Sequence, residues 1–219
     1  MSLFVSFEGP DGAGKSTQIT LVSERISRAG YDVVETREPG GTPLGERVRS
    51  VLLDPGDHEI VPRAEALLMT AARAQHVDEV IRPALERGAI VLCDRFVDST
   101  LAYQGAGRGL PQGELTALQE FALQGIHPDI VILLDIPSDE GIQRRHGSGV
   151  PLNRLDQDNS TFHERVRSWY VQAALDDPAR WVVFDARRSP EDLADDVAET
   201  ILKRHRKNYA ETGANRTEE

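Results

Sequence analysis

The stretch Gly9-Pro10-Asp11-Gly12-Ala13-Gly14-Lys15-Ser16 decides the fold of this chain. It follows the apolar run Leu3–Phe7 and opens a pattern with helical period, and G-x-x-x-x-G-K-S between a strand and a helix is typical of a phosphate-binding P-loop. Glycines admit positive φ and bring backbone N–H groups close to a polyphosphate, while the helix dipole adds positive charge beneath it. We therefore expect a nucleoside triphosphate on this loop, with Lys15 at the β- and γ-phosphates and the Ser16 hydroxyl on Mg²⁺.

Composition narrows the class of protein. The chain has 219 residues, 39% of them hydrophobic, and a formal net charge of −11, which suits one acidic α/β domain and makes DNA or an anionic membrane an unfavourable partner. Its one cysteine excludes an internal disulfide. The first expected strand begins at once, and no apolar run approaches the ~20 residues of a membrane span, so we expect a cytoplasmic protein.

Short apolar runs alternate with stretches of helical period along the whole chain. The expected strands are Leu3–Glu8, Asp32–Thr36, Ala89–Asp94, Asp129–Asp135 and Trp181–Phe184. The expected helices are Ser16–Ala29, Leu44–Leu53, Arg63–Arg87, Gln112–Leu123, Ser138–His146, Thr161–Leu175 and Pro190–Arg206. This alternation predicts an α/β fold, a five-stranded parallel sheet with helices on both faces, in a single domain over 1–206. The polar tail 207–219 is expected to be disordered.

Ligands of such a sheet bind at the carboxyl ends of the strands, and polar residues follow three of them. The loop Thr36–Pro43, rigid through two prolines and two glycines, presents Arg37 and Glu38, unless these form a salt-bridged turn. Asp94 ends an apolar strand as the carboxylate that holds Mg²⁺ does, and Asp135 is its rival.

Two further segments carry polar groups suited to a nucleotide. Arg95 follows Asp94 and has the planar fork that binds phosphate. The segment Asp98–Gly105 supplies Ser, Thr, Tyr and Gln side chains for a base and a sugar, or simply a capped helix start. Met69 and Arg73 share one helix face, and the plain alternatives are a core methionine and a surface charge. We interpret His76 as a satisfied polar residue rather than a catalyst.

An arginine-bearing, glycine-rich stretch follows the fourth strand. Residues 144–154 carry Arg144, Arg145 and Arg154, and such a flap fits a lid that closes over phosphates and excludes water. Asn153–Asp156 faintly echoes the guanine signature of GTPases, but the lysine is replaced, no strand precedes it and no D-x-x-G follows the P-loop.

Four motifs together resemble the thymidylate kinases, a family of P-loop nucleoside monophosphate kinases. They are Phe7–Thr17, Thr36–Pro43, Ala71–His76, and Asp94-Arg95 with Asp98–Gly105, and the resemblance runs from Leu3 to about Arg206. It implies transfer of the ATP γ-phosphoryl group to dTMP, giving dTDP and ADP for dTTP synthesis, with Mg²⁺. It also implies a homodimer.

The resemblance assigns residues to each ligand. ATP would contact Gly9, Pro10, Asp11, Gly12, Ala13, Gly14, Lys15, Ser16, Thr17 and Arg187. The residues implied for dTMP are Asp11, Arg37, Pro39, Met69, Arg73, Arg95, Ser99, Thr100, Tyr103 and Gln104. Arg37 and Arg95 would hold the dTMP phosphate, Arg73 would donate to thymine O4, and Tyr103 would exclude a 2′-hydroxyl. Lys15, Arg95, Arg144, Arg145 and Arg154 would be catalytic, with Ser16 and Asp94 on the metal.

Gly12 inside the P-loop, with arginines downstream, resembles the bacterial variant that carries its catalytic arginines in the lid. Met69 stands where relatives carry an aromatic ring, and Asn153-Arg154 replaces their Asp-Arg. Two alternatives stay open: a P-loop kinase with a different acceptor, and a P-loop ATPase switch or motor.

Overall fold

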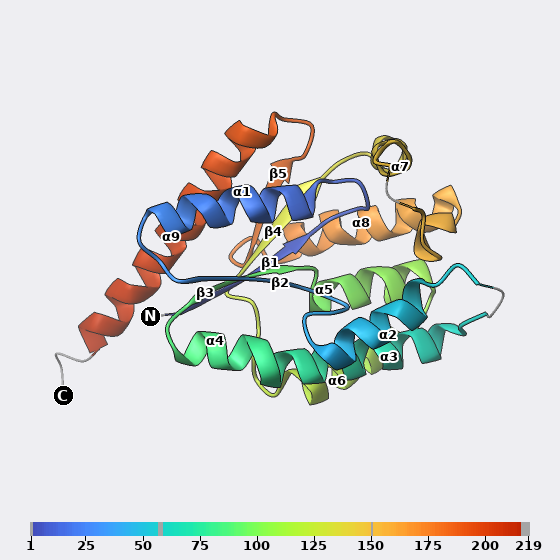
Figure 1. The fold of residues 1–219 in the computed structure, drawn as a ribbon, viewed down its shortest axis with the longest axis horizontal. Helices are drawn as coiled ribbons and strands as arrows, with labels where there is room; N and C mark the ends of the chain where they lie inside the picture. The colour runs from blue at the N-terminus through green and yellow to red at the C-terminus, as the bar shows by residue number, and fades with distance from the viewer. Residues whose placement is uncertain (1, 57–58, 150, 216–219) are drawn as a thin grey trace.

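A computed structural model describes residues 2–56, 59–149 and 151–215 and contains one five-stranded parallel sheet (Figure 1). Its strands are β1 (Leu3–Glu8), β2 (Val33–Arg37), β3 (Ile90–Asp94), β4 (Ile130–Asp135) and β5 (Trp181–Asp185), in the order β2-β3-β1-β4-β5. All six residues of central β1 are buried, as expected for a strand covered on both faces. The predicted sheet is therefore confirmed, with each strand within one residue of its expected bounds.

Helices α1 (Lys15–Arg28) and α9 (Pro190–Asn215) pack against each other on one face of the sheet, the upper face in Figure 1. Buried Val22 and Ile26 of α1 join Val197 and Ile201 of α9 in the core with β1, β3 and β4. This contact fixes the start of α1, and hence the P-loop, at the carboxyl end of β1.

The opposite face is covered by a longer series of helices. They are α3 (Pro62–His76), α4 (Arg82–Glu86), α5 (Val97–Thr100), α6 (Gln112–Leu123) and α8 (Ser160–Asp176), with π-helical turns η1 (Val77–Ile81) and η2 (Leu101–Gly107). The single helix expected over Arg63–Arg87 is interrupted at η1, where the Arg82 N–H bonds to Val77 O. The next residue, Pro83, has no N–H to donate to the preceding turn, which favours this wider turn.

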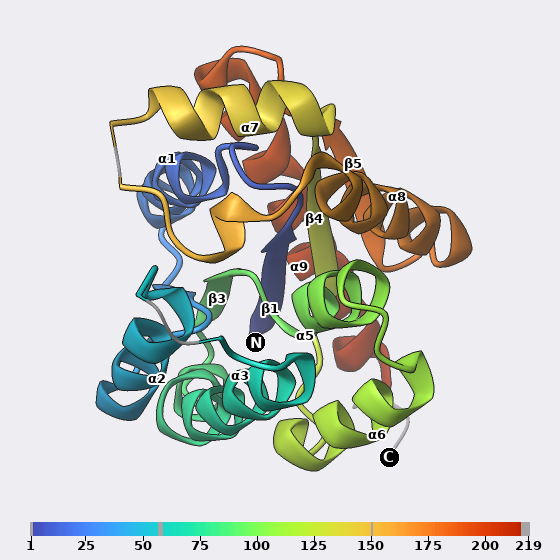
Figure 2. The ribbon, with the colours of Figure 1, turned by 90° about the vertical axis from the view of Figure 1, so that its right-hand side faces the viewer.

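Two helices and a short 3₁₀ turn lie around the carboxyl edge of the sheet, toward which Figure 2 looks. Helix α2 (Pro43–Leu53) begins where Thr42 Oγ1 accepts a hydrogen bond from Gly45 N at 2.9 Å. Helix α7 (Ser138–Gly147) leads through residues 151–154 to η3 (Leu155–Gln157). Two of the three arginines expected in a loop, Arg144 and Arg145, therefore stand on the last turn of α7.

Helix α9 continues past its expected end at Arg206 to Asn215, so residues 207–215 are helical where we expected a disordered tail. Proline is absent from Lys207 to Asn215, so this stretch has no residue that must break a helix. Residues 216–219 lie outside the described part of the chain. Within the described residues, no helix combines the length and apolarity that crossing a membrane requires.

Candidate active site

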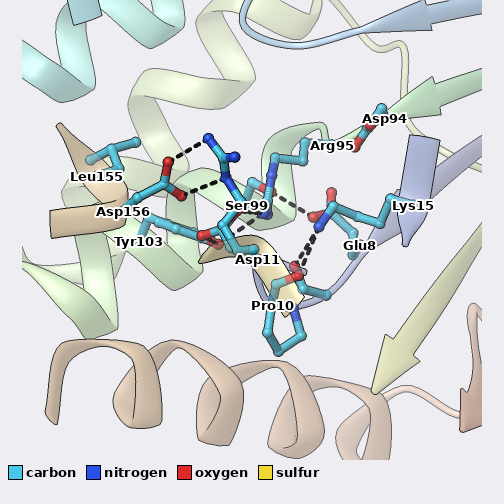
Figure 3. A network of polar contacts seen from close by, with 12 residues as sticks. Glu8, Pro10, Asp11, Lys15, Asp94, Arg95, Ser99, Tyr103, Leu155 and Asp156 are labelled. Carbon is cyan, nitrogen blue, oxygen red and sulfur yellow. Dashed lines mark hydrogen bonds and ion pairs between the residues drawn. The ribbon is translucent and has the colours of Figure 1, made fainter. Parts of the chain in front are cut away.

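The P-loop, Gly9–Ser16, curls around its own lysine (Figure 3). Lys15 Nζ donates hydrogen bonds to Gly9 O at 3.0 Å and to Pro10 O at 2.9 Å. Burial, and next the charge of Arg95, lower the pKa of Lys15 to about 8. An ammonium held in this way is ready to turn toward phosphate oxygens, which would raise its pKa again.

Ser16 and Asp94 meet at the edge between α1 and β3. The Ser16 hydroxyl donates to Asp94 Oδ2 at 2.7 Å. Among the described residues, no group of three or more His, Cys, Asp or Glu side chains could hold a metal ion. A hydroxyl beside one carboxylate still fits Mg²⁺, which usually takes few protein ligands and completes its shell with phosphates and water. Asp135, the alternative metal ligand, instead accepts two hydrogen bonds from Arg167, one on each carboxylate oxygen.

Helix α7 rests directly on the P-loop. A Cβ on Gly12, whose φ is +77°, would overlap the carbonyl oxygen of Gly141 in α7, and a Cβ on Gly141 would overlap Asp11 O. Arg144 and Arg145 follow Gly141 by three and four residues, so they stand on the helix face that meets the loop. Exposed Arg144 donates to Ala186 O at 2.9 Å.

A pocket next to the P-loop gathers nine of the ten residues expected for dTMP. Its wall contains Asp11, Pro39, Met69, Arg73, Arg95, Ser99, Thr100, Tyr103 and Gln104. We call it the acceptor pocket. Arg37 lies outside it, in a groove with Ser16 and Asp94, and pairs with Glu46 at 3.0 Å. The salt-bridged turn is therefore the arrangement that the structure has at Arg37.

Arg73 forms one end of the acceptor pocket and is 2% exposed, so it is not the surface charge of the plain alternative. Its Nε donates to Glu38 Oε2 at 2.7 Å, and its terminal nitrogens donate to Thr100, Gln119 and Phe96 O. Both ring nitrogens of buried His76 are hydrogen-bonded, Nδ1 to Glu38 Oε1 and Nε2 to Thr36 Oγ1, which confirms His76 as a satisfied polar residue. Half-buried Met69 also faces the pocket.

Arg95 forms the other end, beside the P-loop, in the left-handed region at φ 67° (Figure 3). Its Nη2 donates to Asp11 Oδ1 at 2.6 Å and to the Tyr103 hydroxyl at 2.8 Å. Tyr103 in turn donates to Asp11 Oδ2 at 2.7 Å. Burial alone would raise the pKa of Asp11, but the charges of Arg95 and Lys15 outweigh it and hold that pKa at about 2. Asp11 is therefore an anion that links the P-loop to the Arg95 end of the acceptor pocket.

The other two lid arginines are held by buried carboxylates. Arg145 Nη2 pairs with Asp156 Oδ2 at 2.7 Å, and Arg154 pairs with Glu65 of α3. Glu65 also accepts from Gln104 at 2.7 Å, so one carboxylate links the lid to the acceptor pocket. Within the described part of the chain, Arg144 is the arginine of residues 144–154 that forms no ion pair.

Several pocket residues were not expected from the sequence. They are Arg49, Leu53, Phe96, Asn153, Leu155 and Asp156, whereas Glu38, which was expected at the ligand edge, does line the pocket. Arg49 and Leu53 lie one helical turn apart on α2, a spacing that does not differ from that of an ordinary amphipathic helix. The remaining expected ATP residues, Thr17 and Arg187, are exposed, and Arg187 pairs with Asp185 at 2.8 Å.

Comparisons with known proteins agree with the family resemblance found in the sequence. The family model described as thymidylate kinase matches residues 7–197. A thymidylate kinase of Thermomicrobium roseum is 55% identical over 203 residues, covering 93% of this chain and 96% of that protein. One from Pseudomonas fluorescens is 52% identical, covering 84% and 87%. The crystal structure of thymidylate kinase from Ehrlichia chaffeensis superposes with a TM-score of 0.69 at 35% identity, covering 84% of this chain and 92% of that one. This chain therefore belongs to the thymidylate kinase family.

Proposed function

We propose that the chain carries out the reaction of its family in a defined geometry: ATP on the P-loop transfers its γ-phosphoryl group to dTMP in the acceptor pocket, giving dTDP and ADP. The observation that carries this proposal is the contact between Arg95 and Asp11, which joins the phosphate end of the pocket to the P-loop. A phosphate bound at Arg95 would lie next to the loop that holds the donor. The acceptor oxygen is already anionic near neutral pH, so positioning and charge neutralisation supply the catalysis.

The far end of the pocket suits thymine. Arg73 has five N–H groups, and its four hydrogen bonds within the described chain leave one for an acceptor such as thymine O4. Thr100 and Gln104 lie beside it for the base edge, and Met69 supplies apolar surface in place of an aromatic ring. Ser99 lies nearer the phosphate end, where it accepts from Arg95.

Between the two ends, Tyr103 and Asp11 would face the deoxyribose. The Tyr103 ring would fill the space that a 2′-hydroxyl needs, and Asp11 would accept from the 3′-hydroxyl. Pro39 borders the same pocket. Arg37 would join Arg95 on the acceptor phosphate only after leaving Glu46. We therefore expect Arg37 to contribute less than Arg95 to phosphate binding.

For the lid, we assign the transferred phosphoryl group to Arg144. It stands on the face of α7 that touches the P-loop, and among the described residues its hydrogen-bond partner is a backbone carbonyl, Ala186 O. Arg145 and Arg154 would instead hold the lid, through Asp156 and Glu65. Lys15 would neutralise the β- and γ-phosphates. Ser16 and Asp94 would hold Mg²⁺, whose charge stabilises the phosphates when it is bound.

The assembly and location follow from the family resemblance. Leu67 of α3 and Phe121 of α6 are 56% and 77% exposed, and such apolar side chains suit a homodimer contact on helices α3 and α6. Light scattering should give twice the 24.2 kDa mass of one chain. We place the protein in the cytoplasm.

The test is ADP release in a coupled assay with dTMP, dUMP, UMP, dCMP and AMP as acceptors. We expect dTMP to be preferred, with dUMP a poor substrate because a missing methyl group is worth only ~1–3 kcal/mol. A different preferred acceptor would overturn the assignment of thymine to Arg73. Rapid ATP hydrolysis without any acceptor would instead favour a switch or motor.

A further inference from the structure

Glu8 is a buried carboxylate at the end of β1 that shares Ser99 as a hydrogen-bond partner with Arg95 (Figure 3). It is 0% exposed and accepts four hydrogen bonds. Oε1 accepts from the Ser6 hydroxyl at 2.9 Å and from Phe96 N at 2.8 Å. Oε2 accepts from the Ser99 hydroxyl at 2.6 Å and from the Tyr170 hydroxyl at 3.0 Å. Hydrogen bonds of this kind favour the charged form of a carboxylate in the protein interior.

Arg95 depends on the same two hydroxyls. Its Nη1 donates to Ser99 Oγ at 3.2 Å and to the Tyr170 hydroxyl at 3.3 Å. Its backbone, in the left-handed region, is fixed on both sides: Arg95 N bonds to Phe7 O at 2.9 Å, and the next amide, Phe96 N, bonds to Glu8. Glu8 therefore contacts both the backbone and the side-chain support of Arg95 without touching the guanidinium.

The direction of these hydrogen bonds depends on the charge of Glu8. Ser99 and Tyr170 each have one hydroxyl proton. The two hydroxyls also lie 2.9 Å from each other, and either could donate to the other. While Glu8 is ionised, its Oε2 is the stronger acceptor for both protons, so both hydroxyl oxygens present lone pairs to Arg95. If that oxygen carried a proton or an amide N–H₂, it would donate instead, and a displaced hydroxyl proton would turn toward the cation or occupy a lone pair of the other hydroxyl. Arg95 would then lose an acceptor that helps to hold its fork in place.

We propose that Glu8 is the positioning residue of Arg95, and that its negative charge orients the Ser99 and Tyr170 hydroxyls to hold the guanidinium where the acceptor phosphate binds. This rests on the proposed role of Arg95 as the ligand of that phosphate. Glu8 itself touches neither nucleotide.

Titration of Glu8 gives the proposal a pH signature. Burial, and next the charge of Asp98, raise its pKa to about 7, although Ser99, Arg95 and Phe96 N favour the anion. The other ionisable groups facing it are Tyr170, Lys15 and Cys93. Above about pH 7 the carboxylate holds both hydroxyls, and below it the added proton reverses one of them. Affinity for dTMP should therefore fall as the pH drops below 7.

Glu8→Gln tests this with little change in volume. Its carbonyl oxygen must accept from Phe96 N, so its amide N–H₂ faces Ser99 and Tyr170 and reverses them. We expect calorimetry to show dTMP affinity lowered about 10-fold, equivalent to ~1.4 kcal/mol, with ATP affinity changed less than about 2-fold. The slope of dTMP affinity between pH 6 and 8 should flatten, leaving only the titration of the substrate phosphate.

Two companion variants separate positioning from stability. Tyr170→Phe removes one hydroxyl and should lower dTMP affinity about 3- to 10-fold. Ser6→Ala is the matched control, since Ser6 binds the opposite oxygen of Glu8 and its hydroxyl has no bond to Arg95. It should leave dTMP affinity unchanged. Equal effects of all three variants on ATP and dTMP would mark Glu8 as a merely structural residue and overturn the proposal.

Arg95→Lys distinguishes a failure of the positioning role of Glu8 from a failure of the proposed function. If this variant leaves dTMP affinity unchanged, Arg95 is not the phosphate ligand, and both the proposed role of Arg95 and that of Glu8 are wrong. If it lowers the affinity but Glu8→Gln and Tyr170→Phe match Ser6→Ala, only the positioning role of Glu8 falls. If Glu8 acts through Arg95, adding Glu8→Gln to Arg95→Lys should lower the affinity less than about 2-fold further.

Discussion

The arginines of the acceptor pocket and those of the lid differ in how they are held. Arg73 is buried and Arg95 is half-buried, and each donates to a carboxylate and to hydroxyl groups. Arg144 is exposed, forms no ion pair within the described chain, and is held by one carbonyl. The groups proposed to recognise dTMP are thus in place before it binds, whereas the group proposed to act on the transferred phosphoryl is available to move. Recognition and transfer should therefore respond differently to mutation.

The largest effect is expected in the lid. Arg144→Ala should lower kcat about 10³-fold or more, because an arginine that stabilises charge in the phosphoryl-transfer transition state has that weight. The KM for dTMP and the melting temperature should change little, because Arg144 lies outside the acceptor pocket and is exposed. Steady-state kinetics and thermal unfolding measure the two effects.

Arg28→Ala is a suitable control, since Arg28 is an exposed arginine that pairs with Glu24 on the same helix. It should leave kcat unchanged. A fall of less than about 10-fold in Arg144→Ala, or a rise in the dTMP KM with kcat unchanged, would remove Arg144 from catalysis and direct attention to Arg145 or Arg154.

The second effect concerns stability in the acceptor pocket. Arg73→Ala should lower the free energy of unfolding by about 3–5 kcal/mol, because Glu38 would remain buried and without its guanidinium partner. Urea unfolding measures this. The exposed pair of Lys203 and Glu199 provides the contrast, since Lys203→Ala should lower the free energy by less than ~1 kcal/mol. Equal losses in the two variants would contradict the contrast between a buried and an exposed cation.

The fold could be predicted almost entirely, because its signals are local. Buried parallel strands such as β1 and β4 are short apolar runs, and the P-loop has a fixed spacing between strand and helix. The π-helical turns η1 and η2 could not be predicted, because a π turn differs from an α turn by one residue and leaves the hydrophobic period nearly unchanged. The helical ending of α9 was missed since a polar, charged sequence is compatible with both a helix and a tail.

The site could be predicted where a residue stands in a motif, and not where its role depends on a distant partner. Arg95 and Tyr103 follow a strand that ends in aspartate, so their place at the ligand edge was predictable. The role of Glu65 was not, because its partners Gln104 and Arg154 are 39 and 89 residues away. Arg37 ends β2 but lies in a neighbouring groove, because its guanidinium pairs with Glu46 of α2, a partner that the strand pattern does not indicate.

A third effect tests the sugar end of the acceptor pocket. Tyr103→Ala should raise kcat/KM for UMP relative to dTMP roughly 10-fold, because the removed ring opens space for a 2′-hydroxyl. Tyr103→Phe keeps the ring and loses the hydroxyl bonded to Asp11 and Arg95, so it should weaken dTMP binding while the preference over UMP is retained. An unchanged preference in Tyr103→Ala would exclude this residue as the determinant of the sugar.

The smallest effect tests the link between the acceptor pocket and the P-loop. The pKa of Asp11 is about 2 in the folded protein against 3.8 for the ordinary carboxyl, so its ionised form stabilises the fold above pH 3.8 and loses this effect as the pH falls through 2. The difference in unfolding free energy between wild type and Asp11→Asn should therefore shrink by about 1 kcal/mol between pH 7 and pH 3. Guanidinium unfolding at both values measures it. Since Arg95 is the main charge that lowers this pKa, the pH dependence of the difference should become smaller in an Arg95→Met background. A difference that stays constant with pH in wild-type Arg95, or one unaffected by Arg95→Met, would show that Asp11 and Arg95 do not hold each other as a pair in solution.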